Sequence, residues 1–253
     1  MVYDLQKAGL WKRIAAWMFD SILVGILAVG FALLLSLILG YDGYSQSVEA
    51  AYAKYEQEYG VVFDVTQEEY LAMSEEAQQS YDTAYEALIA DPDLLYNYNM
   101  TMNLTMIITS VGILLAVLLW EFVIPLWLGN GQTFGKKIFS LCLVRNDGVK
   151  VNTMQLFTRS ILGKYTVEIM VPVCIVLMLY WGITGLPGTL CLLVLGAAQM
   201  LCLIVSRSNC AIHDLLAGTA VVDITSQMIF RDTDELIAFK KRVAADQAAR
   251  QPY

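Results

Sequence analysis

Four long apolar segments, separated by polar stretches, dominate the hydrophobic pattern of the chain. The first runs from Trp11 to Gly40, and between Ile14 and Leu39 its only charged residue is Asp20. The other three cover residues 101–128, 154–181 and 189–205. Because about 20 apolar residues cross the ~30 Å hydrocarbon core of a bilayer, each segment is predicted to be a transmembrane helix. The expected fold class is therefore an all-α membrane protein with four transmembrane helices.

Composition and charge extend this prediction to the orientation of the chain. Hydrophobic residues make up 57% of the sequence and charged residues 16%, a balance typical of integral membrane proteins. Residues 41–100 hold thirteen Asp and Glu but a single basic residue, Lys54. By the positive-inside rule, both termini and residues 129–160 are expected in the cytoplasm and residues 41–100 outside the cell membrane. Residues 1–40 are interpreted as the cytoplasmic N-terminus and an uncleaved first span.

The acidic segment, residues 41–100, has the period of helices and is predicted to be an external helical hairpin inserted between the first two spans. Its first helix is expected to end at Gly60. Thr66 and Glu69 have the spacing of a capping box that opens a second helix, which should end before Pro92. Ten tyrosines lie in this segment. They are expected to pack the two helices together, and recognition of a partner or glycan is the alternative.

Residues 129–160 are predicted to combine a short helix with a β-hairpin. Phe134, Ile138 and Leu141 recur at helical spacing beside two lysines, which indicates a basic amphipathic helix on the inner leaflet. Residues 146–148, Asn-Asp-Gly between β-branched runs, are a hairpin signal. Since an isolated hairpin is marginally stable, residues 219–224 are expected to complete a small three-stranded cytoplasmic sheet.

The chain after residue 160 is expected to hold two spans and a cytoplasmic end. Residues 161–206 contain the third and fourth spans, and Pro172 is expected to bend the third. Residues 207–224 are predicted to form a short helix, capped by Asn209 and closed by Gly218, followed by a strand. Residues 225–253 are predicted to be a polar helical tail.

Asp20 is the first candidate functional residue, because an ionisable group inside a membrane span is costly unless it has a partner, water or a proton. Arg13 precedes it by seven residues, too far along the helix to pair with it directly, and is either a functional cation or a topological anchor. Glu121, near the end of the second span, is either a headgroup-level carboxylate or a side chain that faces the helix bundle. His213 and Asp214 are candidates on the short cytoplasmic helix, where a packing role for His213 is the alternative to a pH sensor.

Three blocks of sequence carry a family resemblance. They are residues 8–20 (AGLWKRIAAWMFD), residues 130–148 (beginning NGQTFGKK) and residues 213–219 (HDLLAGT). In order and spacing they resemble the RDD family of small multispan membrane proteins, named for one arginine and two aspartates. The resemblance implies that Arg13 and Asp20 are the first two signature residues and Asp214 the third. It also implies transport of a ligand, with monovalent cation/proton antiport in some members.

Two hypotheses of function follow. The first is a transporter or monovalent cation/proton exchanger that uses Asp20, with Arg13, Glu121, His213 and Asp214 as supporting ion or proton sites. The second is a non-transporting membrane assembly or accessory protein that binds a protein partner, and a homodimer is compatible with either. The chain has one histidine and lacks the zinc, phosphate-loop and nucleophile-elbow motifs, so we expect no enzyme, metal, cofactor or nucleic-acid partner. The lipid bilayer, protons and monovalent cations are the expected partners.

Overall fold

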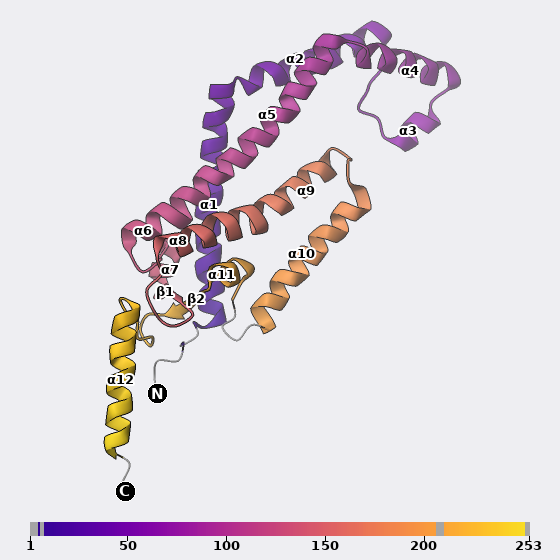
Figure 1. Ribbon diagram of the computed structural model, residues 1–253. Helices are drawn as coiled ribbons and strands as arrows, with labels where there is room; N and C mark the ends of the chain where they lie inside the picture. Colours follow the sequence, from indigo (N-terminus) through magenta and orange to yellow (C-terminus); the bar gives the residue numbers. More distant parts are fainter. Residues whose placement is uncertain (1–4, 6–7, 206–209, 251–253) are drawn as a thin grey trace. The chain divides into compact units, whose positions relative to one another are not determined.

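The computed structural model describes Leu5, residues 8–205 and residues 210–250, except for the side chains of Leu203 and Arg250. The chain divides into two compact units, one of residues 29–112 and one of residues 1–28 and 113–253. Within the described residues, four helical stretches are long and apolar enough to cross a membrane, as the hydrophobic pattern predicted (Figure 1). They are Leu10–Leu39, Pro92–Leu128, Thr153–Tyr180 and Gly185–Cys202.

Two of these stretches are interrupted by π-helical segments. α5 (Pro92–Val117) continues through η1 (Leu118–Val123) into α6 (Ile124–Leu128). Likewise α8 (Thr153–Phe157) continues through η2 (Thr158–Met170) into α9 (Val171–Tyr180), and the chain then turns into α10 (Gly185–Val205). The first helix, α1, spans Leu10–Leu39. The wide π-helical turn is uncommon and occurs frequently at functional sites, so the side chains of η1 and η2 are candidates for functional residues.

Pro125 gives a local reason for the change of helical register in η1. A proline has no backbone N–H, so it leaves without a partner the carbonyl four residues earlier, that of Glu121. The hydroxyl of Ser160 in η2 donates to this carbonyl at 2.7 Å. A side chain of η2 therefore satisfies the carbonyl at the break in the η1 hydrogen-bond ladder, and the two π-helical segments lie against each other.

Among the residues that the structure describes, the sheet of the larger unit has two strands instead of the predicted three. β1 (Leu141–Arg145) pairs antiparallel with β2 (Thr219–Asp223), with Leu143 opposite Val221, so the strand expected at residues 219–224 is confirmed. The turn at residues 146–148 also forms, with Gly148 at a φ of 85°. The expected hairpin is nevertheless reduced to a single bridge between Val144 and Lys150.

The second arm of the hairpin pairs with β1 at only one bridge because the backbone groups that follow have other hydrogen-bond partners. The N–H of Lys150 donates to the carbonyl of Phe230 at 2.9 Å. Two residues later Asn152 accepts from Gln155 as the N-cap of α8. The hairpin signal therefore correctly located a turn, but helix capping prevented a second strand arm.

Alternating residues of the two strands face two separate apolar clusters. Leu141, Leu143 and Val221 pack with Ala16 of α1 and with Leu156 of α8. On the opposite face Cys142, Val144 and Val222 form a second cluster. The sheet thereby fixes the start of α1 beside the start of the third spanning stretch, which positions the charged residues described below.

The short segments around the sheet differ in detail from the predictions. α7 (Phe134–Ile138) has only five residues and is capped by Phe139, and the next residue, Ser140, has a φ of 57°. Leu141 lies in β1 and Lys136 is buried, so the expected amphipathic surface helix through Leu141 is wrong. α11 (Ile212–Ala217) is closed by Gly218 as predicted, while the proposed cap Asn209 lies outside the described residues. α12 (Thr233–Arg250) forms the predicted helical tail.

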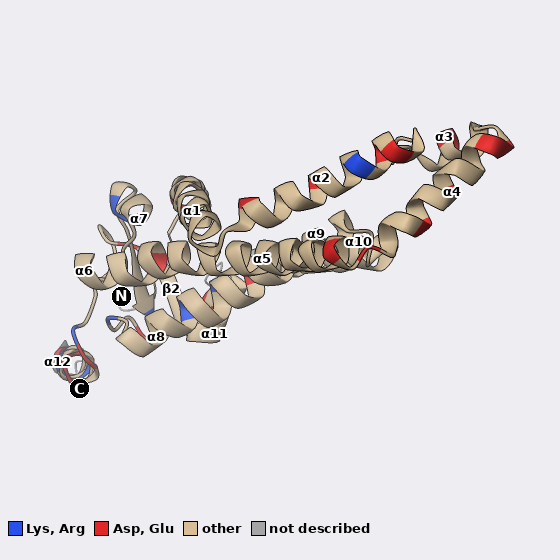
Figure 2. Ribbon diagram, turned by 90° about the horizontal axis from the view of Figure 1, so that it is seen from above, with Lys and Arg blue, Asp and Glu red and all other residues tan. Residues whose placement is uncertain are grey.

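The smaller unit contains α2 (Tyr41–Tyr59), α3 (Gln67–Ala72) and α4 (Glu75–Ile89). Gly60 ends α2 and the Thr66–Glu69 capping box opens α3, as predicted. The second helix of the hairpin is, however, broken, because the Ser74 side chain accepts from Ala77 and starts α4 as a new helix. Asp and Glu residues occur along both α2 and α4, and α2 carries the single basic residue of the acidic segment, Lys54 (Figure 2).

Aromatic rings pack within this unit. Tyr81 lies edge-on to Phe63 and to Tyr70, with ring centroids 5.6 and 5.3 Å apart, and Phe63 also contacts Tyr52 at 5.7 Å. The expected packing role therefore accounts for several tyrosines of the acidic segment.

Candidate functional site

Asp20 projects from α1 into the larger unit and is only 2% exposed. Its Oδ1 accepts from the indole N–H of Trp120 at 2.9 Å and from the backbone N–H of Gly135 at 3.0 Å. Its Oδ2 accepts from the hydroxyl of Thr133 at 2.5 Å and lies 4.0 Å from Nζ of Lys136. Both carboxylate oxygens are thus bound by protein donors, which offsets the cost of burying the charge.

This close contact depends on the sequence Thr133-Phe134-Gly135. Thr133 caps α7 by accepting from the N–H of Lys136, so its hydroxyl lies at the start of the turn. A Cβ on Gly135 would lie 2.6 Å from the carbonyl oxygen of Ala16 and 2.8 Å from the carboxyl carbon of Asp20. Only a glycine therefore lets the α7 backbone approach α1 closely enough to donate to Asp20.

Glu121 is the second buried carboxylate, 1% exposed within η1. Its Oε1 accepts from Nζ of Lys164. Its Oε2 lies 3.6 Å from Nζ of Lys136 and 3.6 Å from Nη1 of Arg159. Among the described residues, however, none donates a hydrogen bond to Oε2. Glu121 therefore faces the bundle, and one of its oxygens keeps an unused acceptor.

Asp214 of α11 is fully buried between two arginines. Its Oδ1 accepts from Nε of Arg159 at 2.8 Å, and its Oδ2 accepts from Nη2 of Arg13 at 3.3 Å. Burial favours the neutral acid, but the charge of Arg159, helped by His213 and Arg13, outweighs it and holds the pKa of Asp214 below its usual value. Arg13 thus pairs with Asp214 and not with Asp20, which agrees with the distance argument from the sequence.

His213 is held between Glu168 and Arg159. Its Nδ1 lies 2.7 Å from Oε2 of Glu168, and its backbone N–H donates to Oε1 of the same carboxylate at 2.9 Å. Its Nε2 lies 2.9 Å from Nη2 of Arg159. A guanidinium can only donate, so Nε2 faces the donor of Arg159 while Nδ1 faces the carboxylate of Glu168. These contacts fix the orientation of the imidazole.

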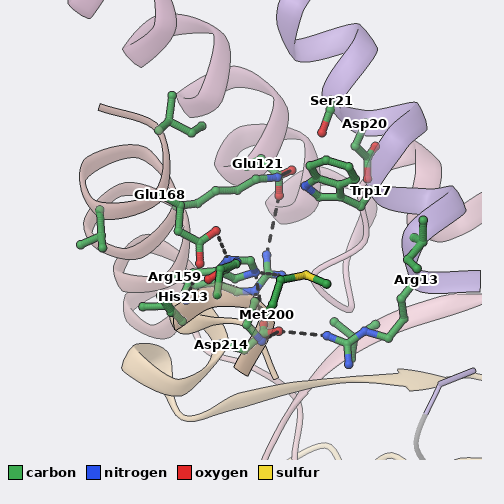
Figure 3. Close-up of a pocket in the computed structure, with 18 of the residues that line it drawn as sticks. Arg13, Trp17, Asp20, Ser21, Glu121, Arg159, Glu168, Met200, His213 and Asp214 are labelled. Atoms are coloured by element: carbon green, nitrogen blue, oxygen red, sulfur yellow. Dashed lines mark hydrogen bonds and ion pairs between the residues drawn. The ribbon is translucent and has the colours of Figure 1, made fainter. Parts of the chain in front are cut away.

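The predicted site residues all belong to one network of close charges (Figure 3). Asp20 connects through Lys136 to Glu121, and Glu121 connects through Arg159 to Asp214, which binds Arg13. The network balances four carboxylates with four arginine and lysine side chains. They are Asp20, Glu121, Glu168 and Asp214, and Arg13, Lys136, Arg159 and Lys164.

Sequence reasoning did not select Lys136, Arg159, Lys164 or Glu168 as site residues. Lys164 and Glu168 are four residues apart in the sequence and would pair locally in an α-helix, but Lys164 donates to Glu121 and Glu168 binds His213. Spacing of four residues predicts contact in an α-helix, whereas η2 is π-helical and directs the two side chains to different partners. The need of each buried carboxylate for a cation was the available signal for these basic residues.

A cavity of about 930 Å³ adjoins the network. Asp20, Glu121, Lys136 and Asp214 line its polar end, and Trp17, labelled in Figure 3, also borders it. Apolar side chains of α10, η2 and α9 complete the walls, among them Val167, Pro172, Leu192, Leu195 and Ile204. The cavity is therefore largely apolar and carries its charge at one side.

Comparison with known proteins agrees with the sequence blocks noted above. The model of the RDD family matches residues 7–218, which include the α1, α7 and α11 residues of the charged network. No curated protein and no solved structure matches the chain significantly. The family match, together with the four apolar helices, identifies the chain as a multispan membrane protein that belongs to the RDD family.

Proposed function

We propose that this protein is a membrane transporter that exchanges a monovalent cation for a proton, with Glu121 and Lys136 as the exchange pair. The observation that carries the proposal concerns Glu121, a residue that lines the cavity: its buried Oε2 receives no hydrogen bond from the described residues and lies 3.6 Å from the ammonium of Lys136. A buried ionisable residue within a membrane span is by default a candidate for ion or proton movement.

Glu121 fits this role better than Asp20, the residue favoured from the sequence. Trp120, Thr133 and Gly135 all donate to Asp20, so a cation would have to displace a complete set of hydrogen bonds. Glu121 offers an oxygen without such a donor. We therefore assign Asp20 to positioning: it holds α7, and with it Lys136, beside Glu121.

Lys136 is the group suited to release the proton. Burial lowers the pKa of its ammonium, an effect that Glu121 opposes and Arg159 reinforces. A monovalent cation that binds Oε2 of Glu121 would repel the ammonium 3.6 Å away and favour loss of one proton. One positive charge enters and one leaves, so the charge of the buried network is unchanged.

Reconstitution into liposomes tests the exchange directly. The full chain is expected to move protons, detected with an internal pH dye, when Na⁺, K⁺ or an alkylammonium ion is added outside. Glu121→Gln should reduce this response at least about tenfold, because it removes the carboxylate charge at the exchange pair. No proton movement with any of these ions, or equal movement by Glu121→Gln, would overturn the proposal.

The proposed orientation follows from charge: both termini and residues 129–160 in the cytoplasm, and residues 41–100 outside. In a bacterial cell membrane, green fluorescent protein fused to the C-terminus should then fluoresce. Alkaline phosphatase inserted beside Asp64 should be active, because it matures only after export. The reverse pattern would invert the orientation and place the charged network near the outer surface.

A second candidate is a membrane assembly protein without transport activity. It is favoured by the saturation of Asp20, since a carboxylate that ties α1 to α7 can serve a purely structural purpose. This hypothesis predicts a stoichiometric protein partner that co-purifies from native membranes. It also predicts that Asp20→Asn lowers thermal stability and partner capture, while proteoliposomes show no cation-dependent proton movement with wild type.

A further inference from the structure

We infer that the cavity beside the charged network binds an organic ammonium with an apolar body, so that hydrophobic amines are the substrate class of the proposed exchanger. The inference rests on the proposed function for transport but concerns binding alone. A volume of about 930 Å³ is that of a site for a drug-sized molecule and far exceeds the need of a bare alkali ion. The side chains that line the cavity indicate the charge and polarity of the ligand.

Two residues that line the cavity carry an acceptor without a donor. Oε2 of Glu121 on η1 and Oε1 of Gln199 on α10 are both buried, and among the described residues neither receives a hydrogen bond. A buried acceptor without a donor is destabilising, so a ligand that donates to either oxygen would offset part of this cost. A protonated amine is such a donor, and its charge suits the carboxylate of Glu121.

The basic side chains at the cavity are already engaged. Lys164 donates to Glu121, Arg159 donates to Asp214, and Lys136 donates to the hydroxyl of Thr133 at 3.2 Å. An anionic ligand would need to take these donors from the two carboxylates and the hydroxyl that already accept from them. The arrangement of donors and acceptors therefore favours a cation over an anion of the same size.

Apolar side chains determine the rest of the ligand. α10 contributes Leu192, Leu195 and Ile204 to the wall, and η2 contributes Val167 and Ile169. Apolar surface of a ligand that is buried against such walls favours binding. An ammonium with an aromatic or alkyl body satisfies both ends of the cavity, whereas a small hydrophilic cation leaves its apolar part empty.

Three probes with one apolar body isolate the headgroup: phenylbutylamine, phenylbutanol and phenylbutyrate. Binding to the full chain in lipid nanodiscs is measured by calorimetry, with empty nanodiscs to subtract partition into lipid. The amine should bind saturably, and the alcohol and the carboxylate at least about tenfold more weakly. Equal binding of the alcohol would identify an acyl-chain site and overturn the inference. Stronger binding of the carboxylate, or no saturable binding, would also overturn it.

Two variants connect the binding to this cavity. Gln199→Leu keeps a similar volume but removes the free acceptor and the hydrogen bond of the amide to Glu168. The amine should therefore bind about tenfold more weakly, and the alcohol should lose less affinity than the amine. Gln57→Leu makes the same chemical change on an exposed part of α2 and should alter neither. If Gln199→Leu fails to fold, Gly196→Leu replaces it, because a Cβ there meets no atom within 4 Å and a leucine would occupy cavity space.

The binding inference and the exchange proposal can be contradicted independently of each other. If the amine binds as described but moves no protons in liposomes, the cavity retains its ligand class and the exchange proposal is wrong. If Na⁺ or K⁺ drives proton movement while the amine shows no saturable binding, exchange stands and the inference is wrong. An unchanged amine affinity in both Gln199→Leu and Gly196→Leu would also exclude this cavity as the site.

Discussion

Nζ of Lys136 lies 3.6 Å from Oε2 of Glu121 and 4.0 Å from Oδ2 of Asp20, so one ammonium faces two buried carboxylates from different spans. The same nitrogen donates to the hydroxyl of Thr133 at 3.2 Å. This ammonium is the shared counter-charge of α1 and η1. Loss of its proton would leave the two carboxylates with less compensation, which an incoming cation can replace.

Lys136→Arg tests whether the proton of this residue matters. Arginine preserves the positive charge but does not deprotonate in proteins, so cation-dependent proton movement in liposomes should fall at least about tenfold. Lys137→Arg is the matched control, because the neighbouring side chain is exposed and should leave transport unchanged. Thermal unfolding of both variants in detergent verifies folding, and full transport by a folded Lys136→Arg would exclude Lys136 as the proton donor.

The contact of η2 with α11 predicts a specific steric defect. A Cβ at Gly163 would lie 2.6 Å from Cβ of His213 and 2.7 Å from its Cα. Gly163→Ala should therefore destabilise the protein by about 1 to 3 kcal/mol, because backbone and side chain must shift apart. Gly25→Ala in α1 meets nothing within 4 Å and should be neutral or stabilising, since alanine favours helix. Equal melting temperatures for the two variants would contradict the close contact.

Sequence periodicity was sufficient to locate the four spans, because length and apolar composition alone define them. It also located the strand at residues 219–224, the capping box at Thr66 and the helix stop at Gly218. Each of these signals is local: the residue types act on neighbours within a few positions. Local signals failed where a distant group competed, as when Phe230 took the N–H of Lys150 and ended the hairpin.

For the candidate site, too, local sequence signals were informative and contacts between distant residues were not. Asp20 and Glu121 could be selected because a charge in an apolar span is visible in the sequence. Their partners could not, because Lys136 and Arg159 come from other elements and resemble ordinary residues at the membrane surface. The π-helical register of η2 was equally hidden: it separated Lys164 from Glu168, which helical spacing had paired.

Thr133 combines two roles that substitution can remove together. Its hydroxyl donates to Asp20 at 2.5 Å and accepts from the N–H of Lys136 as the cap of α7. Thr133→Val keeps the shape but loses both bonds, so the free energy of unfolding should fall by about 2 to 4 kcal/mol. Thr133→Ser retains the hydroxyl and should lose less than about 1 kcal/mol. Equal stability of the two variants, measured by thermal unfolding, would argue against the bond to Asp20.

Asp214 predicts how stability depends on pH. Its pKa is lower in the folded protein than in the unfolded chain, because Arg159 and the neighbouring cations outweigh the effect of burial. Its stabilising contribution is therefore complete above the unfolded value of about 4 and is lost as the pH falls toward the lower folded value. The melting temperature of the wild type should decrease as the pH is lowered from 5 to 3, values spanning about that unfolded pKa.

Asp214→Asn separates this contribution from those of the other carboxylates. The variant leaves Arg159 and Arg13 without a buried counter-charge, so the free energy of unfolding at neutral pH should drop by about 3 to 5 kcal/mol. Its further loss of stability in acid should be shallower than that of the wild type, because one linked proton is absent. Asp147→Asn, at the partly exposed pair with Arg145, should cost less than about 1 kcal/mol. Parallel acid profiles for wild type and Asp214→Asn would contradict the depressed pKa of Asp214.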